Sequence, residues 1–154
     1  MLEEIKQRED ILTGGALNSI RLYAKAFNEK DEIISKKIEG NKKIVTLKDG
    51  SNITIGEEYR LESYNNIIDK NIKTFNDNEE NKKKAKELLI TIMKKIGFEL
   101  EEKDIDKIII NKEQNMYNIT FNMIKGNKEV IGKANINPNL GKISAIKLEY
   151  KEKI

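Results

Sequence analysis

The chain of 154 residues contains no cysteine, no histidine and no tryptophan, and it has a single proline. Without cysteine it has no disulfide bond, thiol nucleophile or cysteine-ligated zinc. Without histidine it has no Ser-His-Asp or Cys-His arrangement, and no imidazole to bind a metal or transfer a proton. The acid–base groups that remain are carboxylates, tyrosines and lysines. These absences lead us to predict that the protein is not an enzyme.

Long apolar runs are also missing from the sequence. No stretch approaches the roughly 18–20 consecutive apolar residues that a membrane-spanning helix needs, so we predict no membrane span in this chain. Residues 1–10 have neither the basic segment nor the apolar segment of a secretory signal. We therefore expect a cytoplasmic protein, or an extracytoplasmic or cell-envelope protein if a leader or anchor has been trimmed.

The composition is that of a folded and highly charged protein. Charged residues make up 36% of the sequence, hydrophobic residues 38%, and the net charge is +3. Basic and acidic residues are interleaved, which favours solubility and argues against a strong field of one sign. The most polar stretch between two periodic segments lies near residues 73–78. We therefore predict one lobe over residues 1–75 and a second over 76–154.

The first predicted lobe consists of a helix and a β-hairpin. Apolar residues in "GALNSIRLYAKAFN" recur at i, i+3 and i+4 spacing, which predicts an amphipathic helix over 15–28. Two β-branched runs, 43–47 and 52–55, flank an Asp-Gly pair that suits the positive φ angles of a tight hairpin turn. The apolar residues of 57–75 have a more helical than extended spacing, so we interpret this segment as a loop leading into a helix.

The second predicted lobe is a helix followed by a meander. The stretch "NDNEENKKKAKELLITIMKKIGF" has N-cap residues, acidic residues in its first turn, lysines in its last turn and a glycine stop, which predict a helix over 79–96. Alternation of apolar and polar residues, clearest in "MYNITFNMI", then predicts a half-solvated antiparallel sheet. Its strands are predicted at 105–111, 116–124, 128–136 and 142–150.

Together these elements predict an α+β fold. Amphipathic helices would pack on one face of an antiparallel β-sheet, with a helix-hairpin N-terminal lobe and a helix-meander C-terminal lobe.

A cluster of carboxylates is the first candidate for chemistry. Paired carboxylates can hydrolyse glycosides or bind Ca²⁺ through oxygen ligands. The cluster lies where the second helix leads into the first strand of the meander, and such connections are commonly acidic and solvated. It consists of Glu101, Glu102, Asp104 and Asp106. We favour the solvated connection, and we predict no catalytic, cofactor-binding or metal site.

Runs of lysine raise the question of nucleic-acid binding, which needs a basic face with aromatic residues that stack on bases. The runs are at residues 36–37, 42–43 and 82–84. In the last of them, glutamates stand four residues before lysines, a spacing typical of a solvated helix face. Aromatic residues make up only 6% of the chain. We predict no nucleic-acid partner.

The only proline lies in "NPNLG", residues 137–141. Proline pre-sets φ for the second position of a turn and the glycine supplies a permissive end, so we interpret the stretch as a turn between the last two strands.

The segment around this turn resembles the PepSY domain family. In that family a helix rich in alanine, leucine and lysine precedes an antiparallel sheet, and an extended run ends in a D-x-x-T-G-x-h turn before the last strand. The segment in question is "NMYNITFNMIKGNKEVIGKANINPNLGKISAIKLEY". Residues 135–141 stand where the family's turn would be, with asparagines in place of aspartates and Leu140 in place of the threonine. The resemblance runs from Asn81 to Leu148, under half of the chain.

This resemblance implies a non-catalytic extracytoplasmic module. Such modules occur in peptidase propeptides, envelope-anchored proteins and spore-germination accessory proteins of Gram-positive bacteria, and are thought to bind or restrain peptidases. We therefore predict a regulatory or protein-binding module of a bacterial cell-envelope protein, whose partner would be a peptidase or another envelope protein. The alternative is a small cytoplasmic mobile-element or toxin-immunity protein that binds one protein partner. A carboxylate-based enzyme ranks third, and we predict no cofactor.

Overall fold

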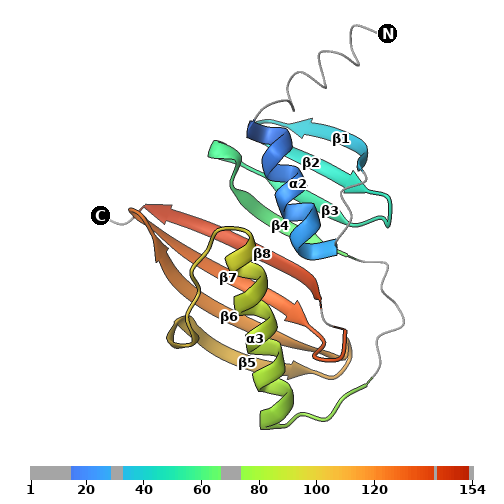
Figure 1. Ribbon diagram of the computed structural model, residues 1–154, viewed down its shortest axis with the longest axis vertical. Helices are drawn as coiled ribbons and strands as arrows, with labels where there is room; N and C mark the ends of the chain where they lie inside the picture. Colours follow the sequence, from blue (N-terminus) through green and yellow to red (C-terminus); the bar gives the residue numbers. More distant parts are fainter. Residues whose placement is uncertain (1–14, 29–32, 67–73, 141, 153–154) are drawn as a thin grey trace, which may run out of the picture.

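The computed structural model describes residues 15–28, 33–66, 74–140 and 142–152 (Figure 1). The described residues form two α-helices and one antiparallel sheet of eight strands in the order β1-β2-β3-β4-β8-β7-β6-β5. In chain order the elements are α2 (Gly15–Asn28), β1 (Ile33–Glu39), β2 (Lys42–Leu47), β3 (Asn52–Ile55), the 3₁₀-helix η1 (Glu57–Tyr59), β4 (Leu61–Asn65), α3 (Glu79–Lys95), the 3₁₀-helix η2 (Glu102–Asp104), β5 (Ile105–Asn111), β6 (Met116–Lys125), β7 (Lys128–Ile136) and β8 (Ile143–Glu152).

The same arrangement occurs twice along the chain. We call α2 with β1–β4 the first unit and α3 with β5–β8 the second unit, and in each a helix precedes a four-strand meander. The last strands of the two meanders pair with each other, β4 against β8, and so join the units into one sheet. This junction has only three residue pairs in register, whereas β7 and β8 have nine. The two units therefore meet along a short seam.

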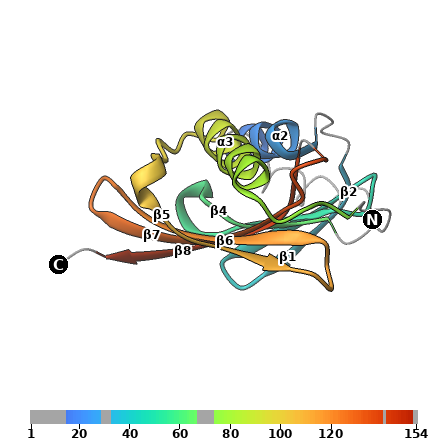
Figure 2. The ribbon, with the colours of Figure 1, turned by 90° about the horizontal axis from the view of Figure 1, so that it is seen from below.

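Both helices lie on the same face of the sheet, and within the described ranges the opposite face carries no helix (Figure 2). One cluster of buried apolar side chains lies between the helices and the sheet and includes residues of both units. In the first unit, the ring of Phe27 at the end of α2 stacks on the ring of Tyr64 in β4, with centroids 4.4 Å apart. In the second unit, Phe75 contacts Tyr117 of β6 at 4.8 Å.

Helix α3 begins and ends where its sequence signals predict. The side chain of Asn78 accepts a hydrogen bond of 2.8 Å from the backbone N–H of Asn81, which satisfies one of the first-turn amides. At the other end, Gly97 has a φ of +95°, and the N–H of Phe98 donates to the carbonyl of Met93 at 2.8 Å. This is the left-handed stop that glycine adopts without steric cost.

The predicted fold class was wrong. There is no helix-hairpin lobe at the N-terminus, because the first unit contributes four strands to one continuous eight-stranded sheet. The hairpin of β2 and β3 is present, with Gly50 at a φ of +88° in its turn, but β1 and β4 flank it on both sides. Part of the segment interpreted as a loop and a helix, residues 67–73, lies outside the described residues.

Strand β4 was missed because a β-bulge gives it the apolar spacing of a helix. Its pairing with β3 shifts register: Thr54 pairs with Ser63, and the next residue, Ile55, pairs with Leu61. The extra residue on β4 brings Leu61 and Tyr64 to the same buried side although they are three positions apart. A spacing of three is one of the two apolar spacings that indicate a helix.

Strand β1 was missed because it lies at an edge of the sheet and buries little. Five of its seven residues are exposed, and only Ile33 and Lys36 are partly buried. Lysines and glutamate on an edge strand discourage pairing with other chains, and they remove the apolar alternation that identifies a strand.

Among the described residues, neither helix is long and apolar enough to cross a membrane.

The stretch "NPNLG" does form a turn over residues 137–140, with Gly141 outside the described residues. The N–H of Leu140 donates to the carbonyl of Asn137 at 3.1 Å. The Asn137 side chain is fully buried; its oxygen accepts the N–H of Asn139 at 2.8 Å and its amide donates to the carbonyl of Asn115 at 2.9 Å. Asn137 therefore stabilises this turn and connects it to the turn before β6.

Candidate functional site

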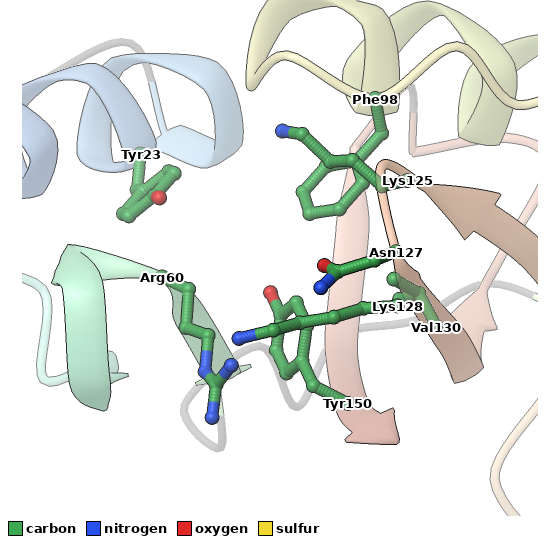
Figure 3. Close-up of a pocket in the computed structure, with 8 residues that line it drawn as sticks. All are labelled: Tyr23, Arg60, Phe98, Lys125, Asn127, Lys128, Val130 and Tyr150. Atoms are coloured by element: carbon green, nitrogen blue, oxygen red, sulfur yellow. The ribbon is translucent and has the colours of Figure 1, made fainter. Parts of the chain in front are cut away.

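A pocket of about 270 Å³ opens at the seam between the two units, on the face of the sheet that carries the helices (Figure 3). Its lining comes from five separate parts of the chain: α2, the residue after η1, the end of α3, the β6–β7 hairpin and β8. The residues are Tyr23, Arg60, Phe98, Lys125, Asn127, Lys128, Val130 and Tyr150.

The β6–β7 hairpin supplies half of the lining. Lys125 and Lys128 pair across the last rung of the ladder, and Gly126 takes the left-handed conformation, with a φ of +63°, that the two-residue turn requires. The turn places Lys125, Asn127 and Lys128 together, and Figure 3 shows their polar groups directed into the same space.

The end of α3 fixes one of these cations. The ammonium group of Lys125 donates to the carbonyl of Gly97 at 3.0 Å, one of the carbonyls that a helix C-terminus leaves unpaired. The same group lies 4.2 Å from the ring centroid of Phe98, within cation–π distance. The glycine stop of α3 thus orients Lys125 without a carboxylate.

Arg60 enters the pocket from the first unit. Its guanidinium lies over the ring of Tyr150 in β8, with its central carbon 4.6 Å from the ring centroid. Its Nε is buried and has no hydrogen bond within the described part of the chain. Its terminal nitrogen forms an ion pair with the exposed Glu57 over 3.8 Å. A long ion pair to an exposed carboxylate contributes little and leaves most of the guanidinium's hydrogen-bonding capacity for a ligand.

The residue before Arg60 has a strained backbone. Tyr59 has a φ of +58°, in the left-handed region that a bulky residue rarely adopts. Its carbonyl accepts the hydroxyl of Tyr23 at 2.9 Å, and the ammonium of Lys43 lies 5.4 Å above its ring. Contacts on both sides hold this conformation, and it turns the chain so that Arg60 points into the pocket.

Two tyrosine hydroxyls complete the pocket (Figure 3). Tyr150 donates to the carbonyl of Leu61 at 2.5 Å, a bond that ties β8 to the start of β4 across the seam. Burial raises the pKa of Tyr150, and the neighbouring Tyr23 hydroxyl raises it further. Burial also raises the pKa of Tyr23. Both hydroxyls are therefore neutral donors at ordinary pH and do not act as bases.

The electrostatic character of the pocket follows from these groups. Of the described residues that line it, three are cationic and none carries a carboxylate. Two acids near Arg60 and Tyr150 are engaged in ion pairs, Glu57 with Arg60 at 3.8 Å and Glu62 with Lys42 at 3.0 Å. The arrangement suits an anion, which would receive hydrogen bonds from guanidinium, ammonium and amide groups between aromatic walls.

The carboxylate cluster at the start of β5 is structural. The side chain of Asp104 accepts the N–H of Glu101 at 2.9 Å, as part of a reciprocal cap on η2. Glu102 pairs with Lys86 at 3.2 Å, and Glu101 pairs with Lys103 at the same distance. Within the described ranges, no group of three or more His, Cys, Asp or Glu side chains could hold a metal ion.

The lysine runs do not form one basic face. The runs at 36–37 and 42–43 lie on the β1–β2 hairpin, where Lys37 pairs with Glu39 at 2.7 Å and Lys42 with Glu62. The run at 82–84 lies on α3 of the other unit, and its Lys82 contacts Glu79 and Asp77.

Comparisons with protein-family models, with curated proteins and with solved structures find no match to this chain. The resemblance to the PepSY family therefore stays a prediction.

Sequence reasoning did not identify the pocket, because its residues are dispersed from position 23 to position 150 and follow no motif. Two local signals were available. The glycine stop before Phe98 predicts a buried aromatic at the end of α3, and the Gly126-Asn127 pair predicts a tight turn flanked by lysines. The pairing of β4 with β8 brings Phe98 and the lysine turn close to Arg60. This pairing joins residues at least 80 positions apart in sequence and has no local signature.

Proposed function

We propose that this chain is a non-catalytic module that binds a protein partner and forms part of a bacterial cell-envelope protein. The observation that supports it most is the pocket at the seam between the units. Tyrosine and arginine dominate the energetics of protein–protein interfaces, and the pocket brings together two tyrosines, an arginine and a phenylalanine.

The chemistry of the pocket supports binding over catalysis. A general acid–base pair needs two groups with pKa values near the working pH. Here the raised pKa values of Tyr23 and Tyr150 keep both phenols protonated, and no carboxylate lines the pocket to accept a proton, as far as the described residues go.

The proposed location in the cell envelope rests on the resemblance of residues 115–150 to the PepSY family. The order of a helix and four antiparallel strands in the second unit is compatible with it. A peptidase or another envelope protein is the partner that the resemblance favours.

Site-specific photo-crosslinking in host cells tests this proposal. A photoreactive phenylalanine would replace Asn127, an exposed residue at the mouth of the pocket, and in a matched control it would replace Lys147, exposed on the helix-free face. We expect one defined crosslinked protein from position 127, in the envelope fraction, and none from position 147.

Two results would contradict it. No crosslink from position 127 in any fraction would refute protein binding through the pocket. A partner recovered only from the cytosol would refute the envelope location and favour a mobile-element or toxin-immunity protein.

A further inference from the structure

We infer that the pocket recognises a peptide carboxylate, so that the partner presents an acidic side chain or a chain terminus to Arg60, Lys125 and Lys128. This inference rests on the proposed protein-binding function and specifies the chemistry of the partner.

Two of the three cations, Lys125 and Arg60, are positioned by contacts that leave their charge incompletely neutralised. Lys125 is held by a backbone carbonyl and a ring, and Arg60 by the ring of Tyr150 and a 3.8 Å contact with an exposed glutamate. Cation–π contacts place a cation while leaving its N–H groups available to an anion.

The donors also surround one space and come from both units. Figure 3 shows the ammonium group of Lys128 next to the guanidinium of Arg60, and the amide of Asn127 between the side chains of Lys125 and Lys128. A carboxylate has two oxygens that together accept about four hydrogen bonds, and a guanidinium can bind it in a bidentate manner. A ligand in this position would contact Arg60 of the first unit and the lysines of the second, and would reinforce the short β4–β8 seam.

The size of the pocket favours a single side chain over a cofactor. Its volume of about 270 Å³ lies just below the roughly 300–1,000 Å³ of pockets that enclose drug-sized ligands and cofactors. The rings of Phe98 and Tyr150 and the side chain of Val130 provide apolar contact for the methylene groups behind a carboxylate. A glutamate or aspartate side chain, or a C-terminal residue, fits this combination.

Capture of defined peptides on the immobilised protein tests the inference without knowledge of the partner. The first library has a central glutamate in nine-residue peptides with amidated C-termini, whose other positions are randomised without aspartate or glutamate. The second has glutamine at that position, and the third has the same glutamine peptides with a free C-terminal carboxylate. We expect at least about tenfold more capture of the first or third library than of the second, the ratio expected from losing one charge-assisted hydrogen bond. Capture should weaken as salt is raised.

Matched variants identify the site. The double variant K125Q/K128Q and the control K133Q/K147Q remove the same charge, but Lys133 and Lys147 are exposed on the helix-free face of β7 and β8. We expect the first to lose the preference for carboxylate peptides and the second to keep it. R60Q should also lose it, and the lysine pair keeps the test valid if R60Q fails to fold.

Three outcomes would overturn the inference. The first is equal capture of the three libraries, the second is a preference that survives K125Q/K128Q, and the third is binding of inorganic phosphate with no peptide captured. None of these results refutes the proposed function, because a crosslinked partner from position 127 would still show protein binding. Conversely, carboxylate-dependent capture without a crosslinked partner would leave the pocket chemistry standing and refute the cellular role.

Discussion

The first and second units contain the same order of elements, but their strands differ in length and regularity. Strands β2, β3 and β4 have six, four and five residues, whereas β6, β7 and β8 have ten, nine and ten. Strand β6 alternates buried residues with half-buried or exposed ones over eight positions, whereas β4 has only five residues and a bulge that interrupts alternation. Both units contain register shifts, but in the long strands of the second unit the alternation remains visible. One architecture can therefore be built with a clear sequence signal or with almost none, depending on strand length and on where a bulge falls.

The largest expected effect comes from the aromatic pairs that pack on the sheet, one from α2 and one from the segment before α3. Phe27 is 2% exposed and stacks on Tyr64, whereas Phe75 is only partly buried against Tyr117. We expect Phe27→Ala to lower the free energy of unfolding by about 3–5 kcal/mol. Phe75→Ala should lower it by clearly less, because the exposed part of the Phe75 ring leaves no cavity when it is removed. Urea denaturation measures both, and equal losses would show that the two pairs are equivalent.

The next effect concerns a close contact found in the second unit. A Cβ atom at Gly132 in β7 would lie 2.0 Å from the ring of Phe121 in β6. We expect Gly132→Ala to cost about 1–3 kcal/mol, because the ring must move within a packed core. The double variant with Phe121→Leu should recover part of the loss. Simple additivity of the two changes in a double-mutant cycle would contradict the ring contact as the cause.

The third prediction is a pH dependence from the hydroxyl that joins β6 to the segment before α3. The Tyr117 hydroxyl donates to Asp77 at 2.9 Å, and burial together with this carboxylate raises the pKa of Tyr117 from 10.0 to about 12. A raised folded-state pKa means that the stabilising contribution is complete below pH 10 and is lost as the pH rises through 12. Urea midpoints should therefore fall more steeply from pH 10 to 12 in the wild type than in Tyr117→Phe. Parallel curves would contradict the assignment.

The smallest effect is expected at the two edges of the sheet, where the units are most alike. Ile34 in β1 is 63% exposed, and Ile109 in β5 is 56% exposed. We expect Ile34→Thr and Ile109→Thr each to change the free energy of unfolding by less than about 0.5 kcal/mol. Thermal melts measure this directly. A loss above about 1 kcal/mol at either position would show that the residue contributes to the core of its unit.

The elements that could be predicted from sequence share one property, which is that their signal is local. Helix α3 has caps, a charge gradient and a glycine stop within its own sequence, and the long strands β6 and β7 show their alternation within ten residues. The β2–β3 hairpin has its turn between its strands.

What could not be predicted depends on contacts between distant residues. Leu61 and Tyr64 share a face only because β3 pairs with β4 through a bulge, and β1 is a strand mainly because β2 lies beside it. The candidate site has the same origin, since Arg60 reaches the lysines of the β6–β7 hairpin through the pairing of β4 with β8. No window along the chain contains that information.

The turn that carries the only proline has a consequence for the chemical lifetime of the protein. Asparagine loses its amide group when the backbone nitrogen of the following residue attacks the side chain. Asn137 is followed by Pro138, whose nitrogen carries no hydrogen and cannot close that ring. The buried side-chain amide of Asn137, which connects two turns, is therefore protected from deamidation by Pro138. The connection between the turns should not be lost by this reaction.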